Sequence, residues 1–379
     1  MRLPILVSVL ALTAVAGYAQ RPSFTLDAET PEGQILQAAA MEEDDAKKLA
    51  LYESYLKQYP GHDHAWWAWA QAQRIYLKLE NYDKVIEAAG PVLEKDPMNS
   101  AAAYNALQAA EKKQDYELIK VWSGRTVEAA RKMLETQQPE DEDEAANWER
   151  EADYARQVIV RCEYSLYAAA AAATDPRVIA DLAATLEERH PESQYVPQVV
   201  DRHFTALQQL KEKEKSVALA ERTLEKDKSH PEMILVVADY YMEGRKDLNK
   251  ALSYSELLVS TLETMSKPEG MAEDAWESRK KTLTGLGHWM QGMILSEQKK
   301  WGPSDAAFRK ALPLIAGNND LLGPAYFFLG LANYNMSRSG KGNPKLRQEA
   351  MRFNELCSKI KGPYQNQAIR NLNAMYAGQ

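Results

Sequence analysis

The chain has 379 residues, of which 45% are hydrophobic and 26% are charged, and its formal net charge at pH 7 is −8. This apolar content excludes an intrinsically disordered chain, and the negative charge argues against nucleic acid as a partner, because phosphate contacts need a basic surface. Two cysteines are too few for a disulfide-dense scaffold or for a four-thiolate zinc site.

The N-terminus has the pattern of an export signal. Arg2 precedes an apolar run that ends at Ala16, and small residues stand at the −3 and −1 positions of a cleavage site after Ala19. The sequence therefore predicts a signal peptide over residues 1–19, followed by a short linker over 20–28. The run is shorter than the roughly 20 residues of a membrane span, so an uncleaved anchor is the less favoured alternative. We expect a periplasmic or secreted protein with no transmembrane segment after cleavage.

The rest of the chain repeats a pair of helical patterns at a period of 34 residues. In residues 66–99, Trp69, Ala72 and Tyr76 have the spacing of one helix face. A turn follows, and a second helical pattern then runs to Pro97, which cannot continue a helix. The pattern predicts a helix-turn-helix unit.

This unit resembles the tetratricopeptide repeat (TPR), whose pattern Trp69, Tyr76 and Pro97 match directly. Gln73 departs from it, because the family has there a glycine that lets the two helices approach closely. Further units, some of them weaker, begin at or near residues 29, 100, 160, 197, 232, 285 and 323. A single helix pair cannot bury its apolar face, so such units stack.

The resemblance implies an all-α fold, a TPR-type helix-turn-helix solenoid (superhelix) over residues 29–376. It would contain about eight helical hairpins. Residues 363–376 have helical spacing of apolar residues and are otherwise mostly polar, which predicts a C-terminal capping helix.

Two segments break the repeat. One is an acidic loop near 136–147, which contains five consecutive acids starting at Glu140. We interpret it as a solvated loop, with an acidic binding segment as the alternative. The other is a loop near 266–274, between two long helical patterns.

The sequence offers little for catalysis. No phosphate-binding glycine loop, nucleophile elbow or metalloprotease motif is present. His62 and His64 flank Asp63 in a metal-like pattern, but no third ligand lies nearby, so a solvated turn is the better interpretation. Cys162 and Cys357 have the character of buried small residues rather than nucleophiles. We expect a protein that is not an enzyme, with no cofactor and no metal.

In TPR proteins, the first helices of successive pairs line a concave groove that binds peptides or partner helices. The resemblance therefore places the partner-binding groove of this chain at Trp67, Arg74, Lys78, Tyr104, Asn105, Gln108, Trp289, Met293, Phe327, Leu331 and Tyr334. It implies an exported scaffold that mediates protein–protein interaction in the cell envelope, with a protein or peptide partner. The alternative is a cell-wall or carbohydrate-binding protein that uses groove tryptophans, because indole rings stack on sugars.

The C-terminal part of this groove carries the sharpest hypothesis. Trp289 and Phe327 fall outside the positions that pair the helices, so the sequence predicts that they are exposed for a partner to cover. In the alternative, the C-terminal helix or the insertion at residues 339–344 folds back and buries them.

Overall fold

Every regular element that the structure describes is helical. The computed structural model describes residue 22, residues 24–25, residues 27–339 and residues 343–377, and these contain seventeen α-helices and one short 3-10 helix. The predicted all-α fold is thus confirmed. The predicted signal peptide, residues 1–19, lies outside the described residues. Among the described helices, none combines the length and the hydropathy that crossing a membrane requires.

The chain divides into two compact units, one up to Ala206 and one from Leu207 onward. The helices up to this boundary are α1 (Pro31–Met41), α2 (Asp45–Gln58), α3 (Ala65–Lys78), α4 (Tyr82–Lys95), α5 (Ser100–Lys112), α6 (Tyr116–Leu134), α7 (Glu142–Ala172) and α8 (Pro176–Arg189), and α9 (Val196–Gln209) contains the boundary.

The second unit continues with the same kind of element. Its helices are α10 (Lys213–Lys226), α11 (Pro231–Met242), the 3-10 helix η1 (Glu243–Arg245), α12 (Leu248–Thr264), α13 (Glu273–Glu297), α14 (Trp301–Ala311), α15 (Asn319–Ser337), α16 (Pro344–Ser358) and α17 (Gln365–Ala377). In the described part of the chain, α1 to α8 pair into four consecutive hairpins and α11 to α16 into three, and α17 packs on α16 as the predicted C-terminal helix.

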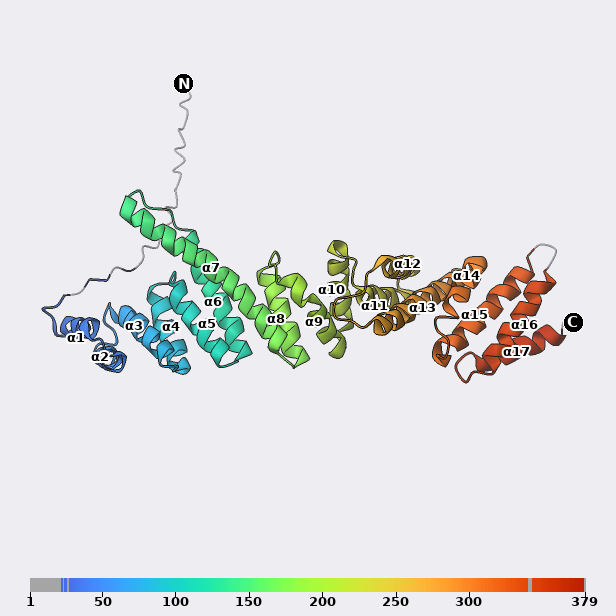
Figure 1. Ribbon diagram of the computed structural model, residues 1–379, viewed down its shortest axis with the longest axis horizontal. Helices are drawn as coiled ribbons and strands as arrows, with labels where there is room; N and C mark the ends of the chain where they lie inside the picture. Colours follow the sequence, from blue (N-terminus) through green and yellow to red (C-terminus); the bar gives the residue numbers. More distant parts are fainter. Residues whose placement is uncertain (1–21, 23, 26, 340–342, 378–379) are drawn as a thin grey trace, which may run out of the picture. The chain divides into compact units, whose positions relative to one another are not determined.

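Helix contacts within each unit are those of a stacked repeat. Consecutive helices pack together, such as α3 with α4 and α13 with α14 (Figure 1). The first helices of neighbouring hairpins also touch: α3 with α5, α5 with α7, α11 with α13, and α13 with α15. Each hairpin therefore buries its apolar face against the next one, which confirms the helix-turn-helix solenoid architecture inside each unit.

Five of the tight turns between helices share one backbone feature. Each contains a residue other than glycine with a positive φ, between 53° and 59°: Glu80, Gln114, Lys211, Arg245 and Lys299. A left-handed residue just after a helix ends it and lets the next helix turn back. Gln114 follows Glu80 by 34 residues, and Arg245 follows Lys211 by 34, so the turn geometry repeats with the period of the sequence.

Gln73, which departs from the TPR pattern, joins three helices. Its buried side-chain amide donates to the backbone oxygens of Val85 in α4 (3.0 Å) and Ala102 in α5 (2.9 Å). Its carbonyl oxygen accepts from the side-chain amide of Asn105 (3.1 Å). Hydrogen bonds from a long side chain thus replace the close helix approach that a glycine would allow.

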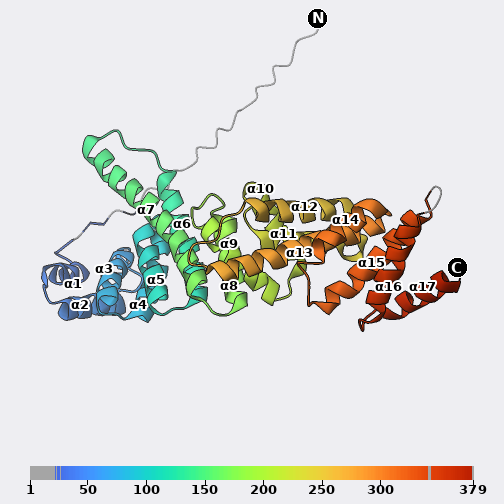
Figure 2. The same cartoon turned by 45° about the vertical axis from the view of Figure 1, so that its right-hand side comes forward.

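The acidic loop predicted near 136–147 is shorter than expected. The link between α6 and α7 ends at Asp141, and Glu142, Asp143 and Glu144 form the first turn of α7. Asp141 caps this helix, because its carboxylate accepts the backbone N–H groups of Asp143 and Glu144 (both 3.1 Å). Acids at a helix N-terminus are favoured by the helix dipole, and this explains why they begin a helix rather than extend a loop. In both views the N-terminal end of α7 extends beyond α5 (Figures 1 and 2).

Candidate protein-binding site

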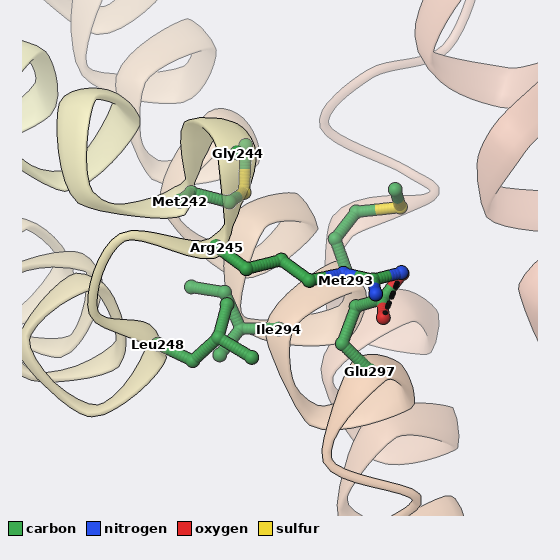
Figure 3. Close-up of a pocket in the computed structure, with 7 residues that line it drawn as sticks. All are labelled: Met242, Gly244, Arg245, Leu248, Met293, Ile294 and Glu297. Carbon is green, nitrogen blue, oxygen red and sulfur yellow. Dashed lines mark ion pairs between the residues drawn. The ribbon is translucent and has the colours of Figure 1, made fainter.

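A side-chain-lined cavity in the second unit is the strongest candidate site. It lies where α11 ends, η1 turns into α12, and the C-terminal half of α13 passes (Figure 3). Its volume is about 480 Å³, and its lining consists of Met242, Gly244, Arg245, Leu248, Met293, Ile294 and Glu297. This volume falls within the range of pockets that hold small ligands or single side chains.

The floor of the cavity is apolar and adaptable. Ile294 is fully buried and belongs to a core cluster that Met242 and Leu248 pack against. Met293, one residue before Ile294 on α13, also lines the cavity and packs partly buried against the core cluster of Phe308 and Phe328. Thioether side chains are flexible and polarisable, so Met242 and Met293 can adjust to the shape of an incoming side chain.

An ion pair stands at the mouth of the cavity. The Arg245 guanidinium lies 2.7 Å from a Glu297 carboxylate oxygen, and these side chains are 68% and 32% exposed. Such exposed pairs add little to stability, so this one is free to exchange its partners with a bound charge. Gly244 (φ 61°) and Arg245 (φ 58°) are both left-handed, and this double turn directs Arg245 toward α13 (Figure 3).

The charged side chains next to the cavity interact with other residues. Lys213 forms an ion pair with Glu243, and this hydrogen bond lowers the pKa of the Glu243 carboxyl. The Lys246 ammonium lies 3.5 Å from the centroid of the Tyr240 ring. The charges that line the cavity itself are therefore those of Arg245 and Glu297.

One wall of this cavity was predicted from the sequence. Met293 was among the predicted groove residues, and it lines the cavity. Met242, Arg245 and Leu248 were missed, because they lie at a helix end, in a turn and at a helix start rather than on a first-helix face. The signal that could have found Arg245 is its position 34 residues after Lys211, at the equivalent hairpin turn.

Trp289 and Phe327, which the sequence predicts to be exposed for a partner, are both partly buried in the structure. The Trp289 indole donates to the backbone oxygen of Leu321 (3.0 Å) and packs partly buried between α13 and α15. The Phe327 ring stacks on Tyr364, with centroids 4.7 Å apart, just before α17. The segment that precedes the C-terminal helix thus folds back on Phe327, which is the alternative that the sequence left open.

The other two predicted residues of this region are also partly buried. Leu331 packs against the core cluster that contains Phe328 and Phe353. The Tyr334 ring lies under the Arg338 guanidinium, 5.7 Å from it. Neither lines the cavity described above.

The first unit has a smaller and more polar cavity of about 360 Å³. It is lined by Arg74, Met98, Asn99, Ser100, Ala101, Met133, Asn147, Arg150, Glu151 and Tyr154. Arg74 is the one predicted groove residue in this lining. The wall that α7 contributes (Asn147, Arg150, Glu151 and Tyr154) was not predicted from the sequence.

Four other predicted residues of the first unit make contacts that stabilise the fold. Lys78 pairs with Asp45 of α2, and Asn105 donates to Gln73. Tyr104 packs partly buried against two core clusters, and Gln108 is partly buried on α5. The structure therefore does not gather these four side chains into one open pocket.

Tryptophans do not form open stacking platforms. All eight lie in the described part of the chain, and none is exposed there. Trp122 and Trp276 are buried, and the Trp148 indole donates to the Thr136 hydroxyl (2.8 Å). A sugar ring needs an accessible indole face, so this arrangement gives the carbohydrate interpretation no support.

The histidines and cysteines that were considered for metal binding or nucleophilic chemistry lie in packed environments. The described residues hold no group of three or more His, Cys, Asp or Glu side chains that could bind a metal ion. His62 is partly buried rather than solvated, and its Nδ1 lies 2.8 Å from the Tyr55 hydroxyl. Burial raises the pKa of the Cys162 thiol to about 12 and that of Cys357 to about 11, so both stay protonated and unreactive.

Comparisons with known proteins give only distant structural similarities. No protein-family model and no curated protein matches the chain. Among solved structures, it is similar to yeast Tom70, with a TM-score of 0.33 and 10% identity over 93% of this chain and 97% of that chain. It is similar to the TPR domain of P58(IPK), with a TM-score of 0.26 and 13% identity over 92% and 98%. It is also similar to a chain of the APC/C hetero-tetramer Cut9-Hcn1, with a TM-score of 0.24 and 12% identity over 93% and 91%. The TPR-type description rests on this chain's own helices.

Proposed function

We propose that this protein is an exported, non-catalytic scaffold of the cell envelope, whose helical repeats bind a protein or peptide partner. The observation that carries the proposal is the cavity between α11, α12 and α13. It combines the apolar floor at Ile294, the two thioethers of Met242 and Met293, and an exchangeable ion pair at its mouth.

The chemistry of the cavity defines the partner that suits it. An apolar side chain of a partner would fill the space over Ile294, because burying apolar surface is the main source of binding energy. A charged group beside that side chain would pair with Arg245 or Glu297, and this would set the orientation of the partner. The best match is therefore a segment with one bulky apolar residue next to a charged residue.

The export part of the proposal is supported by the sequence. Arg2 and the apolar run up to Ala16 have the pattern of a signal peptide with cleavage after Ala19. Sequencing the N-terminus of the protein recovered from the cell envelope tests it, and the expected first residue is Gln20. A protein recovered with Met1 in place contradicts cleavage.

A peptide-library selection tests the binding part. The chain from Gln20 onward is immobilised, and peptides that it enriches are expected to share an apolar residue adjacent to a charge. The affinity of one such peptide is then measured for the wild type and for the variant Met242→Ala/Met293→Ala. We expect a loss of tenfold or more, equivalent to about 1.4 kcal/mol, because the side chains that enclose the peptide are removed.

A matched control comes from the other unit. Met41 is 73% exposed on α1, so Met41→Ala removes a thioether without touching the cavity and should leave the affinity unchanged. Thermal unfolding of all variants verifies that the cavity variant is folded. Enrichment of no peptide family, or a folded cavity variant with wild-type affinity, contradicts the proposal.

A further inference from the structure

The N-terminal arm, defined as the described residues from Pro22 to Thr30, places an aromatic ring on α3. The Phe24 ring stacks on Trp67 with centroids 4.1 Å apart and an angle of 8° between the rings. The His64 ring meets Phe24 edge-on, with centroids 5.1 Å apart. Trp67 is one of the residues predicted to face the binding groove, so the arm occupies a predicted partner position.

The receiving surface is built from two helices and the turn between them. Tyr52 of α2 meets Trp67 edge-on, with centroids 5.9 Å apart, and His64 stands just before α3. We call Tyr52, His64 and Trp67 the α2–α3 aromatic surface. Tyr52 is buried and packs against the indole of Trp67, whose ring face stacks on Phe24.

A tight turn at the base of the arm fixes its direction. The Thr30 hydroxyl donates to the Asp27 backbone oxygen (3.0 Å) and accepts the N–H of Gly33 (3.1 Å). A Cβ atom at Gly33 would lie 1.7 Å from the same Asp27 oxygen, so a side chain there cannot coexist with this turn. The base of the arm is therefore fixed against the start of α1, and among the described residues of the arm the Phe24 ring contacts the α2–α3 aromatic surface.

We propose that the α2–α3 aromatic surface is a binding site for an aromatic side chain in an extended segment of a partner protein, and that Phe24 occupies this site until the partner displaces it. The occupant seen in the structure defines the ligand class: a planar ring that stacks on Trp67 and meets the edge of His64. The inference rests on the proposed function in one respect, that partners are protein segments.

The arm is suited to displacement because its ring contact is small. A short tether holds an intramolecular ligand at an effective concentration of the order of millimolar. For Phe24 to stay docked for most of the time, the same segment added as a free peptide must bind with a Kd below about 1 mM. A partner that binds more tightly than this exchanges with the arm readily.

Docking of the arm is tested by NMR of the chain from Gln20 onward with its tryptophans labelled. The Trp67 indole signal is assigned by Trp67→Phe, and Phe24→Ala is expected to shift it because a stacked ring is removed. Gly33→Ala should shift it in the same direction, since it dislodges the arm without altering any aromatic residue. The Trp66 signal is the internal control and should move little.

Binding in trans is tested with the folded Phe24→Ala chain and the peptide QRPSFTLDAET, which is the chain's own sequence from residue 20 to 30. Titration should move the Trp67 signal back toward its wild-type position with a Kd below about 1 mM. The control peptide QRPSATLDAET should not. The wild-type chain should bind the first peptide several-fold more weakly, because Phe24 competes.

Two results would overturn the inference. One is a Trp67 signal that is the same in the wild type and in Phe24→Ala. The other is no change in that signal up to several millimolar peptide. Both are independent of the cavity near Met293, so a peptide selected for that cavity can still bind when the arm inference fails, and the reverse also holds.

Discussion

At the scale of single residues, Gln73 takes the place of the glycine that TPR units have at this position. A glycine would let α3 and α4 approach closely, whereas Gln73 fills the space and bonds to α4 and α5. The same amide group orders Asn105, a predicted binding residue. The position that departs most from the TPR pattern is therefore a stabilising one.

We predict that Gln73→Ala lowers the free energy of unfolding by about 2–4 kcal/mol. It removes two hydrogen bonds to backbone oxygens, leaves Asn105 without this acceptor and opens a cavity among three helices. Urea denaturation measures the change, with Gln71→Ala on a less buried face of α3 as the control. A loss no larger than that of the control would show that these hydrogen bonds contribute little.

His190 makes the stability of the first unit dependent on pH. It is buried at the end of α8, and its Nδ1 lies 3.5 Å from a Glu163 carboxylate oxygen. Burial lowers the pKa of His190 below its ordinary value of 6.5. The Glu163 carboxylate opposes this shift, while Arg131 and Arg189 favour it. The unfolded chain therefore binds a proton at a higher pH than the folded chain does.

The sign of the effect follows from that difference. Stability from His190 is complete above pH 6.5 and is lost as the pH falls from there toward the lower folded-state pKa. We predict that the free energy of unfolding falls less between pH 7 and pH 5 in His190→Gln than in the wild type, as measured by urea denaturation at each pH. Parallel pH curves for the two proteins would contradict this assignment.

At the scale of elements, the hairpin turns contain backbone strain that the sequence does not reveal. Glu80 and Gln114 are exposed and left-handed, a conformation that costs a residue with a Cβ atom about 1–2 kcal/mol. The backbone N–H that follows Glu80 reaches back to the Tyr76 oxygen (2.9 Å), so the turn closes its helix despite the strain.

Glycine at these turns should therefore stabilise the protein. For Glu80→Gly and Gln114→Gly we predict a gain of about 0.5–1 kcal/mol each, which is the relief of strain less the greater entropy of the unfolded chain. Equilibrium unfolding is the measurement. Glu87→Gly, in the exposed middle of α4, is the control and should cost about 1 kcal/mol. Equal losses at all three positions would mean that the turns are not strained.

Local signals in the sequence predicted much of this architecture, and tertiary contacts account for what they missed. The spacing of Trp69, Ala72 and Tyr76 predicted α3, because a helix face is a local property. The start of α7 at Glu142 was missed, since a run of acids has no apolar periodicity to mark a helix. The burial of Phe327 by Tyr364 depends on how the chain returns after α16, which no local pattern encodes.

The candidate site was harder to predict than the fold for the same reason. Met293 was found because it lies on a first-helix face. Met242 and Arg245 join it only because Gly244 and Arg245 both adopt left-handed conformations, and nothing in the sequence demanded two such residues in succession.

At the scale of the whole molecule, each of the two units presents its own candidate surface. The first has the α2–α3 aromatic surface and the cavity beside Arg74, and the second has the cavity beside Met293. We propose that such surfaces hold a protein partner in the cell envelope. A partner must then come within contact distance of the Met293 cavity in the cell.

Site-specific photocrosslinking in the source cell tests this claim most directly. A photoreactive phenylalanine analogue replaces Met293 in the full chain, and the same analogue replaces Met41, which is 73% exposed in the other unit, as the control. We predict a discrete protein adduct from position 293 that is absent from position 41 and disappears when Ile294 is also changed to Lys in a folded chain. No adduct from position 293, or identical adducts from both positions, would contradict partner binding at this cavity.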